Sequence, residues 1–288
     1  MESTLLSFIL NINLILSLIK IRLMKYIKKI IMKWAVLIKI MPLLILILLA
    51  KILVDYYNLE FLELNSLFTS LVAATIFLIG FLISGVLSDY KESERIPSDL
   101  TASLKNLQDD ALMLSKVKHG DSIGYLSAIR FLEYQKIVAF KIRDWLYREI
   151  TSEEMIKIVS DMNTYFIELD AEVVPAIYII KMKNEQNNLR KIILRIDTIR
   201  NTDFISSAYA IVESMAFIIS IGLVFINIEA EKQNLFAEVF FTLLVSFLIF
   251  YMIALIKDID DPFDYQNNGE SGSEINLDVF NDHLKSLK

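Results

Sequence analysis

The sequence predicts an all-α polytopic membrane protein with four transmembrane helices and a helical domain outside the membrane. The first observation is composition: 55% of the 288 residues are hydrophobic and the mean hydropathy is +0.50, whereas soluble domains are about 45–50% apolar. The second is the presence of four apolar runs near the roughly 20 residues that cross a bilayer core. The third is the scarcity of Gly (7) and Pro (4), which favours long helices over a loop-rich β protein.

Composition also excludes several classes of chemistry. The chain has no cysteine, so disulfides, thiolate metal sites and cysteine nucleophiles are excluded. His119 and His283 are the only histidines, too few for a histidine-based metal cluster. We also find no glycine-rich phosphate loop and no nucleophile elbow. The sequence therefore does not predict an enzyme.

Residues 1–39 form a basic N-terminal region. Residues 3–54 contain no acidic side chain, and Lys25, Lys28, Lys29 and Lys33 follow helical spacing between apolar residues. This pattern predicts a basic amphipathic helix on an anionic cytoplasmic leaflet. The alternative is that these lysines are only the positive flank of the next span, and we favour the interfacial helix.

The spans fall into two pairs. The first pair, within residues 40–88, consists of apolar runs at 40–57 and 66–88, and the second pair, within 204–256, of runs at 204–226 and 235–256. Their backbone polar groups must be satisfied inside the lipid, so each run is expected to be a helix.

Charge sets the orientation of these spans. The basic flank before the first span predicts a cytoplasmic N-terminus, and the acidic loops 58–65 and 227–234 are expected outside. Both termini are then cytoplasmic in a multi-pass protein of the cell (plasma or inner) membrane, with membrane lipid as its surroundings.

The two remaining regions are cytosolic on this topology. Residues 89–203 have nearly equal numbers of basic and acidic side chains, which favours a solvated helical domain over a nucleic-acid binder. Thr151 begins the sequence "TSEE", a capping box that predicts a helix start. Pro175 either starts a helix or kinks one. Residues 257–288 form an acidic tail that contains the linker-like stretch "NNGESGS".

The second span carries the main candidate site. Ala73, Phe77 and Phe81 follow i, i+4, i+8 spacing and so form one stripe, and Ser84 continues near it. The stripe either packs against lipid and neighbouring helices or lines a pore. Periodicity alone favours packing.

Three ionisable residues within the spans are candidates for pairing or function. Lys51 and Asp55 are four residues apart on the first span, which predicts that they pair. Glu213 lies deeper, in the third span, where an ionisable residue either serves function or contacts a neighbouring helix. Both interpretations of Glu213 remain open at this point.

Two short motifs resemble the bestrophin family of ion channels. "FLIGF" at 77–81, followed by "SDYKESERIP", is similar to the second transmembrane helix of that family. "DDPFDY" at 260–265 is similar to the close of its fourth span, and "INLDVFNDHL" resembles a stretch that follows in bacterial members. The resemblance extends from about residue 42 to residue 284 and includes the four-span topology derived above.

The resemblance implies a pentamer around an axial pore, with the second span lining an apolar neck. Phe77 and Phe81 match the two neck phenylalanines, and Ala73 matches a bulkier apolar residue one turn outward. Such a constriction gates by dewetting, and electropositive ring edges favour an anion. We therefore expect a homopentameric channel for small anions such as chloride. The alternatives are a cation (sodium) channel of the same architecture and a non-conducting membrane scaffold or receptor.

The resemblance also raises the question of calcium. Animal members bind calcium with an acidic cluster after the fourth span, and here Asp258, Asp261 and Asp264 are oxygen ligands for a weak metal site. The alternative, which we favour, is an acidic helix end or a subunit contact. No cofactor is therefore expected, with calcium as the exception to test.

Overall fold

The computed structural model describes residues 34–119, 122–202, 205–227, 235–265 and 273–287. The chain divides into two units, each formed by separate stretches of sequence. Of the described residues, the first unit comprises 34–80, 209–227 and 235–258, and the second comprises the others. The boundary falls within the second span, so this helix contributes residues to both units.

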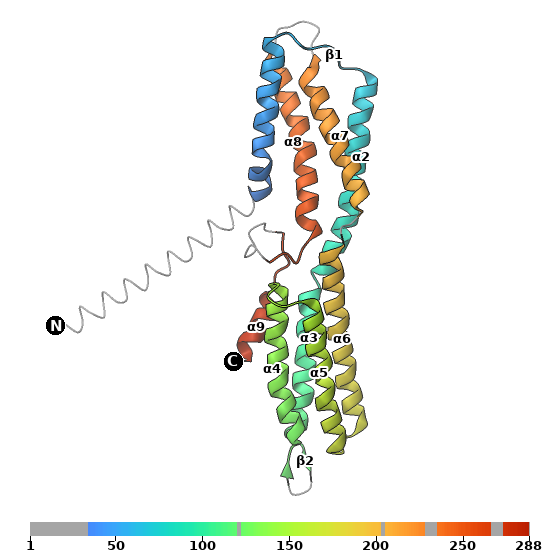
Figure 1. Ribbon diagram of the computed structural model, residues 1–288, viewed down its shortest axis with the longest axis vertical. Coiled ribbons are helices and arrows are strands. Elements are labelled where there is room, and N and C mark those ends of the chain that lie inside the picture. Colours follow the sequence, from blue (N-terminus) through green and yellow to red (C-terminus); the bar gives the residue numbers. More distant parts are fainter. Residues whose placement is uncertain (1–33, 120–121, 203–204, 228–234, 266–272, 288) are drawn as a thin grey trace, which may run out of the picture. The chain divides into compact units, whose positions relative to one another are not determined.

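The first unit is built mainly from four helices that are long and apolar enough to cross a membrane (Figure 1). They confirm the predicted fold class. They are the helix Trp34–Tyr56, α2 (Ser66–Ser93), α7 (Ser206–Phe225) and α8 (Leu235–Asp260). Their length and composition support an integral membrane protein. Most of the predicted interfacial helix lies outside the described residues.

Two close approaches tie the first unit together. The short strands β1 (Leu62–Glu63) and β4 (Ile226–Asn227) pair in parallel, where the sequence predicted only loops. Gly222 lets α7 approach α2, because an added Cβ would lie 2.5 Å from Cε2 of Phe68. At Gly80, by contrast, no described atom lies within 4 Å of such a Cβ.

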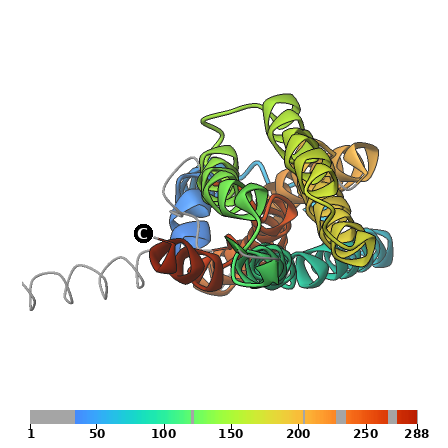
Figure 2. The same ribbon diagram turned by 90° about the horizontal axis from the view of Figure 1, so that it is seen from below.

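A helical bundle forms most of the second unit, and Figure 2 shows its helices end-on. Its helices are α3 (Ile96–Leu114), α4 (Leu126–Leu146), α5 (Ser152–Ala171) and α6 (Ala176–Asn201). The hairpin of β2 (Lys118–His119) and β3 (Ser122–Ile123) connects α3 to α4. The core is apolar and fully buried at, among others, Leu104, Leu107, Phe131, Val138, Ile142, Met162 and Leu189.

Local sequence signals explain where these helices begin. Thr151 caps α5 by accepting from the Glu154 amide at 3.2 Å, and Glu154 accepts from the Thr151 amide at 3.0 Å, so the predicted capping box is confirmed. Pro175 is the N-cap of α6, so it starts a helix and does not kink one. Pro97 lies in the first turn of α3, where a missing amide hydrogen costs nothing.

Two buried glutamines link the bundle helices through backbone carbonyl groups. Gln135 of α4 donates to the Leu104 carbonyl of α3. Gln186 of α6 donates to the Val159 carbonyl of α5 at 2.6 Å. A helical carbonyl can accept a second hydrogen bond, so these amide NH2 groups are partnered without opening a helix. The buried Oε1 of Gln186 has no partner among the described residues.

The acidic tail ends in a helix that the sequence analysis did not predict. This helix, α9 (Asp278–Ser286), packs on α3 and buries Phe280, His283 and Leu284. The Nδ1 atom of His283 is buried and has no hydrogen-bond partner among the described residues. Burial, with a smaller contribution from Lys105, lowers the pKa of His283 below its usual value.

We expect acid to weaken the docking of α9. With its folded-state pKa lowered, His283 binds fewer protons in the folded state than in the unfolded state. Stability present above the unfolded pKa of about 6.5 is therefore lost as the pH falls towards the lowered folded value. Thermal unfolding measured between neutral and mildly acidic pH should show a smaller loss in His283→Gln than in the wild type. Equal losses would contradict this role of His283.

Candidate functional site

The stripe predicted on the second span lies on the exposed side of α2. Phe77 is 75% exposed and Phe81 is 61% exposed, although both are large apolar side chains. The opposite side of the helix is packed, with Leu82 and Val86 each 1% exposed. One side of α2 thus belongs to the core of the chain, and the other is free to contact lipid or another molecule.

Ala73 and Ser84 are also exposed and fall on the same side by helical spacing. We call Ala73, Phe77, Phe81 and Ser84 the exposed face of α2. Gly80 lies on this side too, and no described atom fills the space beside it. The face is consequently apolar and uncharged, with two aromatic rings as its largest features.

The charged end of α2 is paired with α6. Arg195 holds Glu92 with a fork of two hydrogen bonds, from Nε at 3.0 Å and from Nη2 at 2.7 Å. The same guanidinium lies 3.7 Å from Asp89. Arg195 therefore compensates acidic charge at the helix exit, and the sequence analysis missed it because the partners are about one hundred residues apart.

Glu213 forms an ion pair with Lys257, which joins α7 to α8. The two side chains are 45% and 53% exposed in the single chain. The sequence left two interpretations of Glu213 open, and this ion pair corresponds to the second, a contact with a neighbouring helix. It also compensates the charge of Glu213.

Among the described residues of the first unit, Lys51 is the most deeply buried charge, with 0% of its side chain exposed. Its Nζ lies 2.5 Å from Glu60, 2.7 Å from the carbonyl oxygen of Ile226 and 3.5 Å from Glu238. The expected partner, Asp55, is one helical turn away on the same helix, but the ammonium group is directed to the two glutamates. Lys51 thereby links its helix to the connection that follows it, to β4 and to α8.

Three carboxylates gather around this ammonium group. The oxygens of Asp55, Glu60 and Glu238 lie within 4.8 Å of one another, the one such group of acidic, histidine or cysteine ligands that the described residues form. Lys51 already supplies a cation to it. The cluster is therefore explained by an internal counter-ion.

The tail aspartates offered as a weak calcium site have other partners as well. Asp261 accepts a hydrogen bond from Arg148 at 3.0 Å and another from the Phe263 amide at 3.3 Å. Asp258 and Asp264 also have interaction partners. A calcium site at these residues stays a prediction.

Comparison with known proteins bears on the fold. No protein-family model matches the sequence, and no curated protein matches it. A structure of a bacterial bestrophin homolog from Klebsiella pneumoniae, in a variant form, matches with a TM-score of 0.67 at 17% identity, covering 86% of this chain and 97% of that chain. The chain has the bestrophin fold. A second structure of that bestrophin homolog gives a TM-score of 0.66 at 16% identity, with 85% and 95% covered.

A third solved structure, described as a membrane protein, gives a TM-score of 0.65 at 16% identity over 86% of this chain and 95% of that one. These identities are low, so the likeness establishes a bestrophin-like architecture of nearly full length. The family resemblance of the two short motifs is thus confirmed at the level of the fold.

We predict that Lys51→Met destabilises the first unit. The substitution keeps an apolar stem but leaves buried Glu60 and Glu238 without their cation, and breaking a buried pair in this way costs about 3–5 kcal/mol. The thermal midpoint of the purified protein should fall by several degrees or more. Lys257→Met, which breaks a half-exposed pair, is the matched control and should have a smaller effect. Equal effects would contradict the role of burial.

Proposed function

We propose that the chain is one subunit of a homo-oligomeric ion channel, a pentamer, in which the exposed face of α2 from each copy lines an apolar neck on the central axis. The exposure of Phe77 and Phe81 on the side of α2 opposite buried Leu82 and Val86 carries this proposal. The bestrophin-like fold supports it, because the resemblance of the short motifs implies a second span that lines the pore. Ala73 then forms the outer and wider ring of the neck.

The permeant ions that we propose are small anions such as chloride. The neck offers no charge, and the electropositive edges of Phe77 and Phe81 favour a partly dehydrated anion. Ser84 adds a hydroxyl donor on the same face. Glu213 would disfavour anions only if its charge were uncompensated, and Lys257 pairs with it. No cofactor is required by this mechanism.

The proposed location is the cell membrane, with both termini in the cytoplasm. The basic flank that includes Lys39 supports this orientation, because lysine and arginine are retained on the cytoplasmic side. The acidic connection that includes Glu60 and Glu63 would then face outward.

Truncating both neck residues tests the pore directly. In Phe77→Ala/Phe81→Ala the dewetted constriction becomes wider, so we expect single-channel conductance in planar bilayers to increase severalfold. Phe217→Ala is the matched control, since Phe217 of α7 is 63% exposed and also apolar. The control should leave conductance unchanged.

An absence of conductance in both the wild type and the double variant would favour a non-conducting scaffold or receptor. An equal rise in conductance in the Phe217→Ala control would show that truncating any exposed aromatic residue of these helices alters conductance. That result would contradict a specific neck at Phe77 and Phe81.

Selectivity follows from the same recordings under a KCl gradient. A reversal potential near the chloride Nernst value supports the anion channel, and one near the potassium value supports the cation alternative. The mass of the protein in detergent tests the assembly independently, because a monomer has no central axis to line. Recordings with calcium and with a chelator test the tail aspartates, including Asp258 and Asp264.

A further inference from the structure

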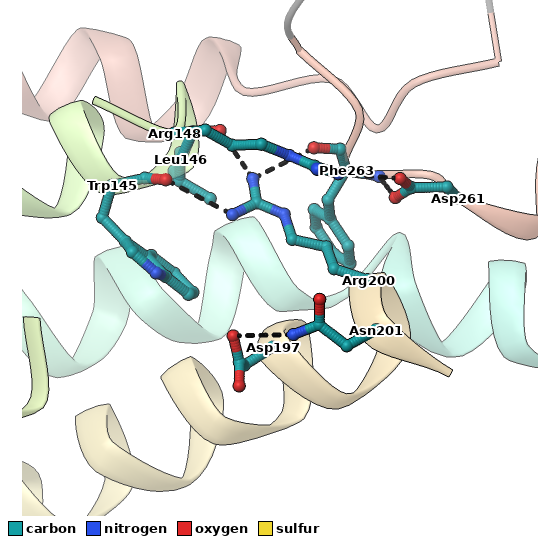
Figure 3. A network of polar contacts seen from close by, with 8 residues as sticks. All are labelled: Trp145, Leu146, Arg148, Asp197, Arg200, Asn201, Asp261 and Phe263. Atoms are coloured by element: carbon teal, nitrogen blue, oxygen red, sulfur yellow. Dashed lines mark hydrogen bonds and ion pairs between the residues drawn. The ribbon is translucent and has the colours of Figure 1, made fainter. Parts of the chain in front are cut away.

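Arg200, near the end of α6, reaches into a pocket of backbone oxygens in the second unit (Figure 3). Its Nη2 donates to the carbonyl oxygens of Leu146 at 2.5 Å and Phe263 at 3.0 Å, and its Nη1 donates to that of Trp145 at 3.3 Å. The guanidinium carbon also lies 5.1 Å from the centre of the Trp145 ring. One side chain thus links α6, the C-terminal end of α4 and the segment that follows α8.

The oxygens around Arg200 are of the type that hard cations take. Trp145 and Leu146 lie at the end of α4, where the last carbonyl groups form the negative pole of the helix, which attracts cations. The Trp145 carbonyl also accepts from the Arg148 amide at 2.9 Å. Phe263 adds a third carbonyl from residues 259–265, and Asp261 supplies carboxylate charge nearby. Backbone carbonyl and carboxylate oxygens are the ligand set of a calcium ion.

The charge of the guanidinium persists in this site. Burial is the main cause that lowers the pKa of Arg200 to about 10, with Arg148 adding repulsion, while Asp261, Asp197 and Tyr265 act in the opposite direction. Arginine therefore stays protonated at neutral pH. Arg148 holds Asp261 at 3.0 Å, so the second arginine is neutralised by the carboxylate and does not compete for the carbonyl oxygens.

We propose that Arg200 is a built-in cation that holds residues 261–265 on the helical bundle, doing from within the chain what a bound metal ion would otherwise do. This attachment is constitutive, because its cation is never released. The inference goes beyond the proposed channel activity and does not depend on it. It makes Arg200 a positioning residue for the segment that follows the last transmembrane helix.

The site is then selective for a guanidinium group by shape as well as charge. Three carbonyl oxygens are met by a planar fork of N–H donors, a geometry that an ammonium group does not reproduce. Removing the side chain at Cβ should leave an oxygen-lined vacancy that free guanidinium can occupy. Stabilisation by such a ligand grows with its concentration according to its affinity for the folded state.

Chemical rescue tests the proposal on the full chain in detergent. We expect Arg200→Gly to melt several degrees below the wild type, and millimolar guanidinium chloride to restore much of this loss. Urea at the same concentration is the control probe, because it has nearly the same planar shape and no charge. Arg195→Gly is the matched variant, since Arg195 lies on the same helix and pairs with Glu92 at a partly exposed site. Its helix-propensity cost is at least as large, because Arg195 lies further inside α6, and it should show no rescue.

Several results would overturn the proposal. Equal rescue by urea would show that shape alone matters, and equal rescue of Arg195→Gly would show a general effect of the salt. Two measurements remain if Arg200→Gly does not fold. Arg200→Lys should fold with intermediate stability. If Arg200→Lys were as stable as the wild type, the requirement for the planar guanidinium fork would be refuted. The melting temperature of the wild type should also be the same in calcium and in a chelator, and a fall in the chelator would refute a built-in cation.

Discussion

The ammonium group of Lys51 has no exposed surface, and the polar groups around it come from the connection after its helix, from Ile226 and from α8. A buried charge without partners is among the costliest features a fold can have. The helix packing of the first unit must therefore bring these segments together. Arg200 imposes the same constraint on the second unit through the carbonyl oxygens of α4 and Phe263. In the part of the chain that the structure describes, each unit thus contains a cation, fully buried at Lys51 and partly buried at Arg200, whose partners include residues distant in the sequence.

Local signals made much of this fold predictable. The four spans follow from the length of apolar runs, and the start of α5 follows from Thr151 and Glu154 because a capping box needs only four consecutive residues. The partners of Lys51 were not predictable in this way. Spacing on one helix indicated Asp55, whereas the partners lie 9 residues away at Glu60 and far beyond at Ile226. Tertiary packing decides which of several nearby carboxylates a buried lysine meets.

The tail shows a different limit of sequence reasoning. Its acidic residues and its linker-like stretch indicated a solvated segment, and this interpretation missed the buried face of α9. The signal was nevertheless present, since Phe280 and Leu284 follow helical spacing. Net charge describes the exposed side of a helix and says little of the other side. The exposed face of α2 is the converse case, because spacing correctly placed Phe77 and Phe81 on one side, but only the structure could reveal that this side is left uncovered within the chain.

The sign of a permeant ion depends on which charges near its path remain uncompensated. Asp89 and Glu213 are acidic residues that would favour a cation if their charges were uncompensated. The structure places Arg195 3.7 Å from Asp89 and pairs Glu213 with Lys257, so neither acid contributes its full charge to the surrounding potential. Because these acids are compensated, selectivity at the proposed neck depends on the weaker electrostatics of two aromatic rings and on the cost of dehydrating the ion. Those contributions favour an anion without excluding other small ions strongly, and modest selectivity for chloride is the outcome consistent with such a neck.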